Sequence, residues 1–500
     1  MRTFYITTNR LNNRWSRYKT RFVGNLRRGV SHKPYCPNLY VWRYYVWRYI
    51  VVYPALSILA MPPLPLSSAT PSTSAPPLGQ QMYQLVTTLY PICRSITGDG
   101  VRQTLQILQQ HVPLEIHEVP SGTQVYDWTV PQEWNIRDAY IKNARGEKII
   151  DFQALNLHVV NYSTPIHQTM SLEALKQHLY SLPDHPDWVP YRTTYYQENW
   201  GFCLAHNQLL ALEEGDYEVY IDATLAPGHL TYGEAYLPGY TTEEVLISCH
   251  VCHPSLANDN LSGMAIATFL AKYLATVPRH YSYRFLFIPG TIGSITWLCL
   301  NEAQALQIKH GLVLTCLGDA GKFTYKRSRR GNAEIDQVAE YVLQQAGISH
   351  EVIDFFPYGY DERQYCSPGF NLAVGCMMRS PHGRFPEYHT SADNLDFVTA
   401  ENLAESYQHT LEILQVLERN RTYLNQNPKC EPRLGKRGLY KAVGGHATGA
   451  VNEMALLWVL NLSDGDYSLL EIAKRSGLGF DQIYRAAQVL EQHDLLQVVR

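Results

Sequence analysis

The sequence predicts an α/β fold built on a mostly parallel β-sheet, and three patterns carry that prediction. Between residues 243 and about 420, short apolar runs alternate with stretches whose apolar residues recur at helical spacing. Polar residues follow the apolar runs. A separate strand-rich and aromatic composition fills residues 113 to 240. The alternation is typical of parallel strands covered by helices on both faces.

The same patterns place individual elements. Residues 82–112 have helical spacing. A helix is predicted at 171–182, because Ser171 can cap its start and Pro183 would end it. The tail, 432–500, contains three short helical stretches and resembles a winged helix. Strands are predicted at 245–248, 283–288, 312–316 and 372–376, with helices at 263–277, 294–305 and 333–346.

Charge and cysteine usage limit the class of protein. The 500-residue chain has a net charge of −3 and 45% hydrophobic residues, enough for a sizeable core. Residues 1–60 carry eleven lysines or arginines and no acid, which leaves 31 basic and 45 acidic residues for the rest. Residues 61–500 are therefore acidic overall and lack the general excess of positive charge that binding to nucleic acid needs. The ten cysteines are scattered, as expected of reduced thiols in a cytoplasmic protein.

The N-terminal segment, residues 1–81, is predicted to be a disordered or mis-assigned extension. Its apolar run, 49–60, is too short to span a bilayer as a helix, and 61–80 is a proline-rich linker. Three hypotheses stay open: a gene start placed too early, with the true first residue at Met61 or Met82; a basic arm for membrane surfaces; or a disordered or targeting segment.

The stretch from Cys249 to Gly263 holds the richest set of metal-type ligands. An apolar strand ends at His250, and Asp259 lies in the loop that leads into the next helix. Imidazole and carboxylate suit Zn²⁺, which accepts nitrogen and oxygen ligands. The alternatives are that Asp259 caps the helix and that His250 is structural. The Cys-x-x-Cys-His pattern also matches haem attachment, which is disfavoured because its cysteines would end a buried strand.

Further polar groups follow the other predicted strands. Asp319 comes after the strand at 312–316, although a turn aspartate would suffice to explain it alone. Glu362 lies in Tyr-Asp-Glu-Arg-Gln-Tyr, and Glu387 and His389 lie in Pro-Glu-Tyr-His-Thr, where helix capping is the alternative. Because the carboxyl ends of parallel strands meet at one edge of a sheet, these groups together indicate one site.

These motifs resemble the zinc aminopeptidase family that includes leucyl aminopeptidases and glutaminyl cyclases. A closer similarity is to a bacterial branch of aminopeptidase-like proteins, through Pro-Ile-Cys-Arg-Ser-Ile-Thr-Gly at 91–98, Val-Tyr-Asp-Trp-Thr-Val-Pro at 125–131 and Cys-His-Val-Cys-His-Pro-Ser at 249–255. The resemblance covers about residues 82–500. It implies an α/β domain of the zinc aminopeptidase type with metal ligands at His250, Asp259, Asp319 and His389.

One departure from the family concerns a pair of adjacent glutamates before a Gly-Ser. The corresponding stretch here, Pro-Gly-Thr-Ile-Gly-Ser at 289–294, has no acid. One zinc ion is therefore expected rather than two, and the general base must come from elsewhere, with Glu362 and Glu387 as the candidates. His253 could be a ligand or could orient one.

The resemblance also implies the domain order and the function. Residues 82–120 would begin the aminopeptidase-like domain, 121–240 would be an inserted β-rich domain, 241–430 the main domain and 431–500 the winged helix. The expected activity is hydrolysis of small peptides or amino-acid amides, without nucleic-acid or membrane partners for the folded part; a homo-oligomer is an open option. The alternatives are a degenerate fold that binds a peptide or amino sugar, and a regulator acting through its tail.

Overall fold

The computed structural model describes residues 76–439 and 452–499. The hypotheses on residues 1–75 therefore lie outside the described residues. The first described helix, α1 (Leu78–Leu89), buries Met82 and Leu85 on one face. Across the described ranges, every helix is either too short or too polar to cross a membrane.

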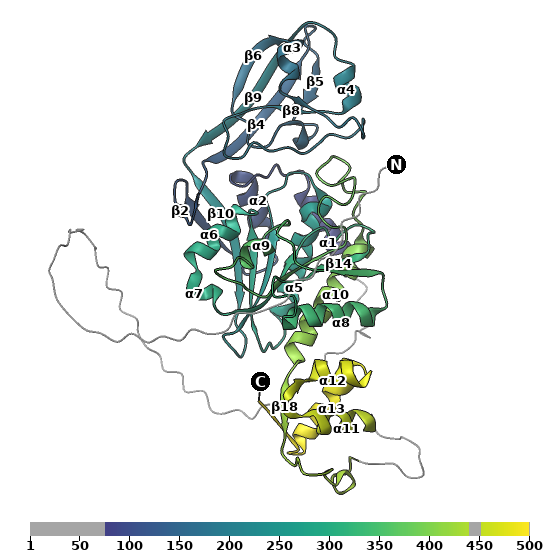
Figure 1. Cartoon of the computed structure of the whole chain (residues 1–500). Helices are drawn as coiled ribbons and strands as arrows, with labels where there is room; N and C mark the ends of the chain where they lie inside the picture. The colour runs from purple at the N-terminus through teal and green to yellow at the C-terminus, as the bar shows by residue number, and fades with distance from the viewer. Residues whose placement is uncertain (1–75, 440–451, 500) are drawn as a thin grey trace, which may run out of the picture. The chain divides into compact units, whose positions relative to one another are not determined.

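The largest sheet of the described residues has eight strands and is mostly parallel, as predicted (Figure 1). Its central strands β12, β11, β13 and β16 run parallel to one another, while β10 and β14 flank them in the antiparallel sense. The strands in spatial order are β1 (Glu115–Pro120), β10 (His229–Leu237), β12 (Ser282–Ile288), β11 (Glu244–His250), β13 (Ile308–Leu314), β16 (Val374–Met378), β14 (Phe323–Lys326) and β15 (His350–Ile353).

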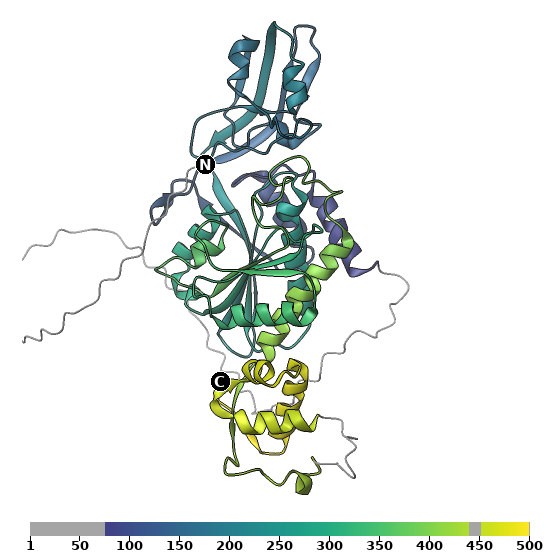
Figure 2. The same cartoon turned by 45° about the vertical axis from the view of Figure 1, so that its right-hand side comes forward.

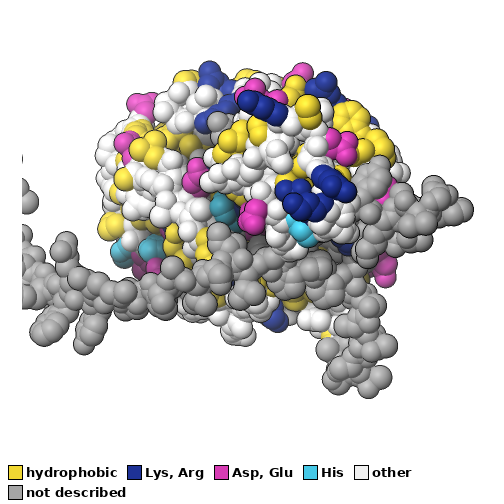
Figure 3. Space-filling view, turned by 90° about the horizontal axis from the view of Figure 1, so that it is seen from below, with side chains coloured by type: hydrophobic (Ala, Val, Ile, Leu, Met, Phe, Trp, Pro, Cys, Tyr) yellow, Lys and Arg dark blue, Asp and Glu magenta, His cyan; other side chains and the backbone are white. Residues whose placement is uncertain are grey.

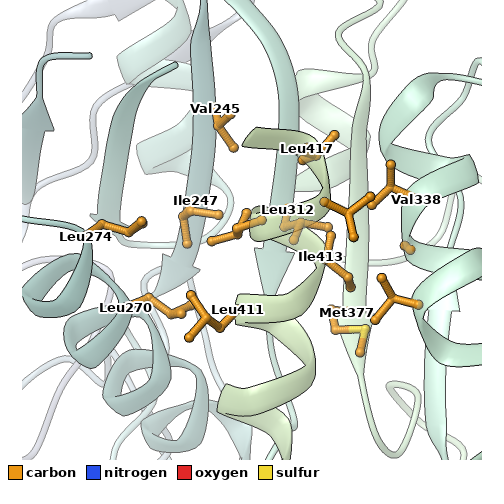
Figure 4. Packing of buried hydrophobic residues seen from close by; sticks show 14 of the residues in the cluster. Val245, Ile247, Leu270, Leu274, Leu312, Val338, Met377, Leu411, Ile413 and Leu417 are labelled. Atoms are coloured by element: carbon orange, nitrogen blue, oxygen red, sulfur yellow. The ribbon is translucent and has the colours of Figure 1, made fainter. Parts of the chain in front are cut away.

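Helices cover both faces of this sheet because its strands alternate their apolar side chains (Figure 2). Val245 and Ile247 of β11 pack in the core cluster that also contains helices α5, α8 and α10, whereas Leu246 packs in the opposite cluster with α6. Figure 4 shows the first of these clusters. The helices around the sheet are α2 (Asp99–Leu108), α5 (Gly263–Leu274), α6 (Ile292–Leu300), α7 (Glu302–Ala305), α8 (Glu334–Ala346), α9 (Glu362–Tyr365) and α10 (Ala400–Arg419).

Two observed strands have bounds that differ from the predicted ones. The strand expected at 312–316 ends at Leu314, since Cys316 has a φ of +49°, which no strand residue adopts. The strand expected at 372–376 begins at Val374, because the amide of Leu372 bonds back to the carbonyl of Tyr365. The earlier end of β13 matters for the site, since it places Cys316 beyond the strand.

The helix predicted at 171–182 is wrong beyond its first turns. Ser171 does cap α3 (Leu172–Lys176), but the chain then enters β7 (Leu179–Tyr180). That strand pairs in parallel with β8 (Phe202–Cys203) and thereby satisfies its backbone groups without a helix. Tertiary pairing has overridden the local helical spacing.

Residues 133–226 contain a four-stranded antiparallel sheet in the order β5, β4, β9, β6. Its inward side chains include Ala139, Ile141 and Val219, each almost wholly buried. The strands are β4 (Glu133–Lys142), β5 (Lys148–Asp151), β6 (Ile166–Ser171) and β9 (Asp216–Ala226); a hairpin, β2 (Gln124–Val125) with β3 (Trp128–Thr129), precedes them, η1 (Asn156–His158) follows β5, and α4 (His206–Leu210) follows β8.

The tail has the three short helices that the sequence predicted. Ser468 and Glu471 form a reciprocal capping box at the start of α12, which ends at Gly477 with a φ of +71°. Three strands pair beside the helices. The elements are β17 (Thr422–Asn425), η3 (Leu434–Arg437), α11 (Glu453–Leu462), β18 (Asp464–Ser468), α12 (Leu469–Ser476), α13 (Phe480–Gln492) and β19 (Leu496–Val498).

Candidate metal centre

Three neighbouring parallel strands deliver the site to one edge of the large sheet. His250 is the last residue of β11, Cys316 follows β13, and His382 and His389 lie in the loop after β16. Between β11 and α5 the chain forms an irregular helical turn, η2 (Ala257–Ser262), which carries Asp259. The strand-end rule that motivated the sequence prediction thus describes how the fold assembles these side chains.

The carboxylate of Asp259 is the centre of the cluster. Its Oδ1 lies 2.8 Å from His250 Nε2, and its Oδ2 lies 3.0 Å from His389 Nε2 and 3.2 Å from His253 Nδ1. The side chains of Asp259 and His250 are wholly buried, whereas that of His389 is 32% exposed. The cluster is therefore reached from solvent on the side of His389.

The electrostatics of the cluster favour an anionic Asp259 beside neutral His250 and His389. Burial lowers the pKa of His250 to about 3 and also lowers that of His389, despite the opposing effect of Asp259. Burial alone would raise the pKa of Asp259, but the adjacent His253 and His250 hold it well below its usual value. Neutral imidazole nitrogens and an ionised carboxylate are the form in which these side chains bind metals.

The donor set fits a zinc ion. His250, His253 and Asp259 offer ligand atoms that all lie within 4.8 Å of one another, and His389 contacts the same carboxylate. Zn²⁺ commonly takes nitrogen and carboxylate ligands in a tetrahedral arrangement. The structure thus brings together three predicted ligands, His250, Asp259 and His389, and adds His253, which the sequence left undecided.

Other buried groups hold the loops that carry these ligands. Asp393 accepts hydrogen bonds from the backbone amides of Asn258 (2.5 Å) and Asp259 (2.9 Å). Arg94, from the 91–98 motif, is fully buried and donates from Nε to the carbonyl of His253 at 2.9 Å. Their role is to fix the backbone on both sides of the metal-type ligands, as supporting residues do in metal sites generally.

Two tyrosines orient the histidines. The ring of Tyr360 lies 3.8 Å from that of His250, and its Oη is 3.2 Å from His253 Nε2, which directs Nδ1 of His253 to Asp259. Tyr191, from the segment before β8, donates its backbone amide to the carbonyl of His389 at 2.8 Å. His389 has a φ of +57°, and this pairing helps to hold the uncommon conformation.

The other three predicted site residues are engaged elsewhere. The carboxylate of Asp319 accepts from Asn258 Nδ2 (2.7 Å), Ser380 Oγ (2.7 Å) and a backbone amide. Glu362 pairs with Lys326 Nζ at 2.8 Å. Glu387 lines a surface hollow that also includes Trp188 and Asn394. Asp319 therefore contacts the loop that carries Asp259 but bonds to none of the cluster histidines in the described residues.

Sequence reasoning missed His382, Tyr360 and Tyr191. His382 could have been found by the same rule as His250, because it follows the buried strand β16 in a short polar loop. Tyr360 and Tyr191 carried no signal, because tyrosine is abundant throughout this chain, at 36 residues. Only their contacts with the histidines distinguish them.

The ion pair of Glu362 leads to a test of its role. Lys326 and Glu362 are 2% and 1% exposed, so Lys326→Met would leave an uncompensated buried carboxylate and should cost about 3–5 kcal/mol of unfolding free energy. Urea unfolding would measure it. The double variant Lys326→Met/Glu362→Leu should recover most of the loss.

The matched control is Lys322→Met, which breaks a surface pair with Glu351 and should cost less than about 1 kcal/mol. Equal losses for the two lysine variants would contradict a structural role for Glu362 and would return it to the list of candidate bases.

Comparison with known proteins places this geometry in a family. A domain of unknown function (DUF4910) matches residues 83–420, and a winged helix-turn-helix family (HTH_47) matches residues 421–498. A Clostridium acetobutylicum protein named "putative polysaccharide biosynthesis protein with aminopeptidase-like domain" is 55% identical over 421 residues, which cover 84% of this chain and 97% of that protein.

Two solved structures are similar to this chain in fold. A "putative peptidase" from Clostridium acetobutylicum has a TM-score of 0.80 at 55% identity and covers 84% of this chain and 96% of its own. A zinc aminopeptidase from Bacillus subtilis has a TM-score of 0.50 at 12% identity over 68% of this chain and 94% of its own, which shows a shared fold. The chain belongs to the DUF4910 family, with an α/β domain of the zinc aminopeptidase fold and a C-terminal winged helix.

Proposed function

We propose that this protein is a zinc-dependent, aminopeptidase-like hydrolase of small peptides or amino-acid amides. The single observation that carries the proposal is the buried carboxylate of Asp259 in contact with His250, His253 and His389, which come from the loops after two different strands, β11 and β16. The names of the Clostridium relatives, a "putative peptidase" and a "putative polysaccharide biosynthesis protein with aminopeptidase-like domain", support the same class of activity.

His250, Asp259 and His389, with His253, would hold the ion. Bound there, zinc would polarise the scissile carbonyl and lower the pKa of a water molecule. The residues of the chain supply the rest: Tyr360 and Asp393 keep the ligands in place, and the exposed side of His389 is where a substrate can approach.

A proton acceptor is needed because the Pro-Gly-Thr-Ile-Gly-Ser stretch carries no acid. Asp361 reaches this stretch from another loop, with its Oδ1 accepting from Ser294 Oγ at 2.8 Å. Its Oδ2 is buried without a hydrogen-bond partner among the described residues, unlike the paired Glu362. Burial raises the pKa of Asp361 to about 7, in the range suited to accepting a proton near neutral pH. We assign this role to Asp361 in preference to Glu362 and Glu387.

The second candidate function is a non-hydrolytic protein that binds a peptide or an amino sugar. The acid-free segment around Gly290 favours it, as does the relative named for polysaccharide biosynthesis. A regulator acting through the tail is a third option.

The sequence also leads us to propose a cytoplasmic location, no membrane partner for the folded part and assembly into a homo-oligomer. Every cysteine within the described ranges is free, which supports the proposed cytoplasmic location because thiols stay reduced there.

The metal assignment predicts that His389→Ala lowers zinc affinity by at least about 100-fold, more than a supporting residue would. Zinc would be measured by mass spectrometry after dialysis, together with hydrolysis of a panel of aminoacyl amides. His167→Ala, a histidine 65% exposed in β6, should keep both zinc and activity. Full zinc retention by folded His389→Ala would refute the ligand, and zinc binding without turnover of any substrate would favour the binding protein.

The assignment of Asp361 predicts a pH profile. A base must be deprotonated, so kcat should rise as the pH increases through about 7, the pKa of Asp361. Asp361→Asn should lower kcat by about 10²–10⁴-fold and remove the rise, while zinc content stays unchanged. Glu387→Gln is the matched control and should retain the profile. If Glu387→Gln abolishes the profile and Asp361→Asn does not, the base is Glu387.

The winged helix is proposed not to bind nucleic acid. The first turn of α13 faces the main domain, since the amide of Phe480 donates to Tyr341 Oη at 2.9 Å and Asp481 pairs with Arg419 at 2.8 Å. Its helix offers only Arg485 as a basic side chain. On the face shown in Figure 3, lysine and arginine are interspersed with acidic and hydrophobic side chains.

For the full-length protein and duplex DNA, fluorescence anisotropy should therefore show binding no tighter than the non-specific range of about 10⁻⁴–10⁻⁶ M at physiological salt. Tight binding that weakens steeply as salt increases would contradict the proposal. It would also favour the regulator over the hydrolase.

A further inference from the structure

Exposed aromatic side chains gather at the β2–β3 hairpin, which contains the Val-Tyr-Asp-Trp-Thr-Val-Pro motif. Tyr126 and Trp128 are 45% and 47% exposed, and Tyr196, from the loop between β7 and β8, is 49% exposed. The rings of Trp128 and Tyr196 have centroids 5.6 Å apart, and those of Tyr126 and Phe370 are 6.2 Å apart. We call these four residues the aromatic patch. Apolar side chains that gather on a surface mark binding sites, whereas isolated ones do not.

Three rings of the patch, all but that of Tyr196, line a hollow of about 180 Å³. Residues of β2 and α6 are in contact beside it, and Figure 1 shows the two elements next to each other. The remaining lining is of two kinds: apolar side chains of α6 (Ile295 and Leu298) and polar ones (Asp127, Gln364 and Ser367). Sites for drug-sized ligands measure about 300–1,000 Å³. This smaller hollow therefore suits a single ring.

The polar groups of the hollow are available to a ligand. Among the described residues, the side chains of Asp127, Gln364 and Ser367 have no hydrogen-bond partner. The hydroxyl of Tyr126, by contrast, donates to Glu302 Oε1 at 2.7 Å, which fixes its ring. The backbone of Tyr126 has a φ of +54°, which is rare for a bulky residue. The hollow thus combines a held aromatic ring with a carboxylate, an amide and a hydroxyl that can bind polar groups.

The helices that line the hollow also carry the proposed proton acceptor. Ser294 and Ile295 are neighbours in α6; the hydroxyl of Ser294 donates to Asp361, and Ile295 lines the hollow. Asp361 is also the N-cap residue of α9, the helix that contains Gln364. The residues that would contact a ligand in the hollow are therefore only a few positions along the chain from the proposed base and its partner.

A second connection leads from the patch to the histidine cluster through tyrosines. Tyr196 follows Tyr195, whose hydroxyl lies 3.0 Å from that of Tyr191. The ring of Tyr191 contacts the ring of His389, with centroids 5.1 Å apart. His389 is the histidine on the solvent side of the cluster. Aromatic side chains thus extend from the patch to the side of the metal centre where a substrate can approach.

We propose that the hollow of the aromatic patch binds a neutral pyranose ring, and that the amide hydrolysed by this protein is carried on a sugar. The C–H groups of a pyranose carry a partial positive charge and pack on the negative face of an aromatic ring. Its hydroxyls can bond to the carboxylate, amide and hydroxyl of the hollow. The charge of Asp127 would repel a uronic acid.

The substrate class rests on the proposed function, whereas the binding of the sugar does not. In the hydrolysis, water would add across the C–N bond of the amide. The carbonyl carbon would gain the hydroxyl and leave as an amino acid, and the nitrogen would gain the proton and leave as the amine of an amino sugar.

Saturation-transfer difference NMR on the full-length protein tests the binding, with the methyl glycosides of glucose, N-acetylglucosamine and glucuronic acid as probes. We expect signals from the C–H faces of the two neutral glycosides and a weaker signal from the uronide. Trp128→Ala should lower the affinity for the neutral glycosides by about tenfold, as expected for the loss of one aromatic contact. Asp127→Asn should raise the uronide signal to the level of the neutral probes. Tyr240→Ala, which removes a 77% exposed tyrosine outside the hollow, is the control and should bind as the parent.

Kinetics test the substrate class. The parent protein should show a higher kcat/KM for an amino acid joined to the amine of glucosamine than for the simple amide of the same amino acid. Trp128→Ala should lower the ratio of the two values by about tenfold, since only the first substrate carries a ring for the hollow. An unchanged ratio would overturn the sugar as part of the substrate.

The proposals fail in different ways. Pyranose binding without hydrolysis of either amide would overturn the hydrolase and support the saccharide site. Hydrolysis of both amides without a glycoside signal, or with an equal signal in Trp128→Ala, would overturn the saccharide site and leave the hydrolase intact. If phenylalanine amide displaces the glycosides and its own signal is lost in Trp128→Ala, the occupant is the apolar side chain of a peptide, and the sugar is overturned.

Discussion

The buried negative charge of Asp259 is the constraint around which the centre of this protein is arranged. An ionised carboxylate removed from water costs several kcal/mol unless partners or a metal compensate it. Three imidazoles surround this one, and none of the three lies next to it in sequence. The loops after β11 and β16 must therefore converge on one point, and that convergence sets the geometry in which any ion or substrate would be held.

The convergence is maintained by groups that never touch a ligand atom. Arg94 ties the N-terminal motif to the loop of His253, and Asp393 holds the backbone of Asp259. The β-rich region between β1 and β10 contributes as well, because Tyr191 pairs with the backbone of His389. Segments that are far apart in the sequence thus hold the backbone of the same small group of ligand-type residues. These supporting residues have a structural role, and through it they set the geometry of the site.

Acidic side chains near the site divide by their partners. Glu362 is neutralised by a buried lysine and Asp319 by three hydrogen-bond donors. Asp361 retains a carboxylate oxygen without a partner in the described residues and bonds to Ser294 of the acid-free Pro-Gly-Thr-Ile-Gly-Ser segment. A difference in pairing, and not in residue type, is what distinguishes a structural acid from one able to exchange a proton.

The sequence by itself determined the mostly parallel sheet, the winged helix, the strand-end position of His250 and the position of Asp259 in the following loop. These depend on apolar periodicity and on caps such as Ser468, which act over a few residues. The tertiary structure decided which polar residues meet. Lys326 pairs with Glu362 across 36 positions, and His382 reaches Asp259 from the loop after β16. The predicted helix 171–182 was replaced by β7 for the same reason. Local patterns do not reveal pairing between distant segments, although buried charges and backbone groups obtain their partners from such pairing.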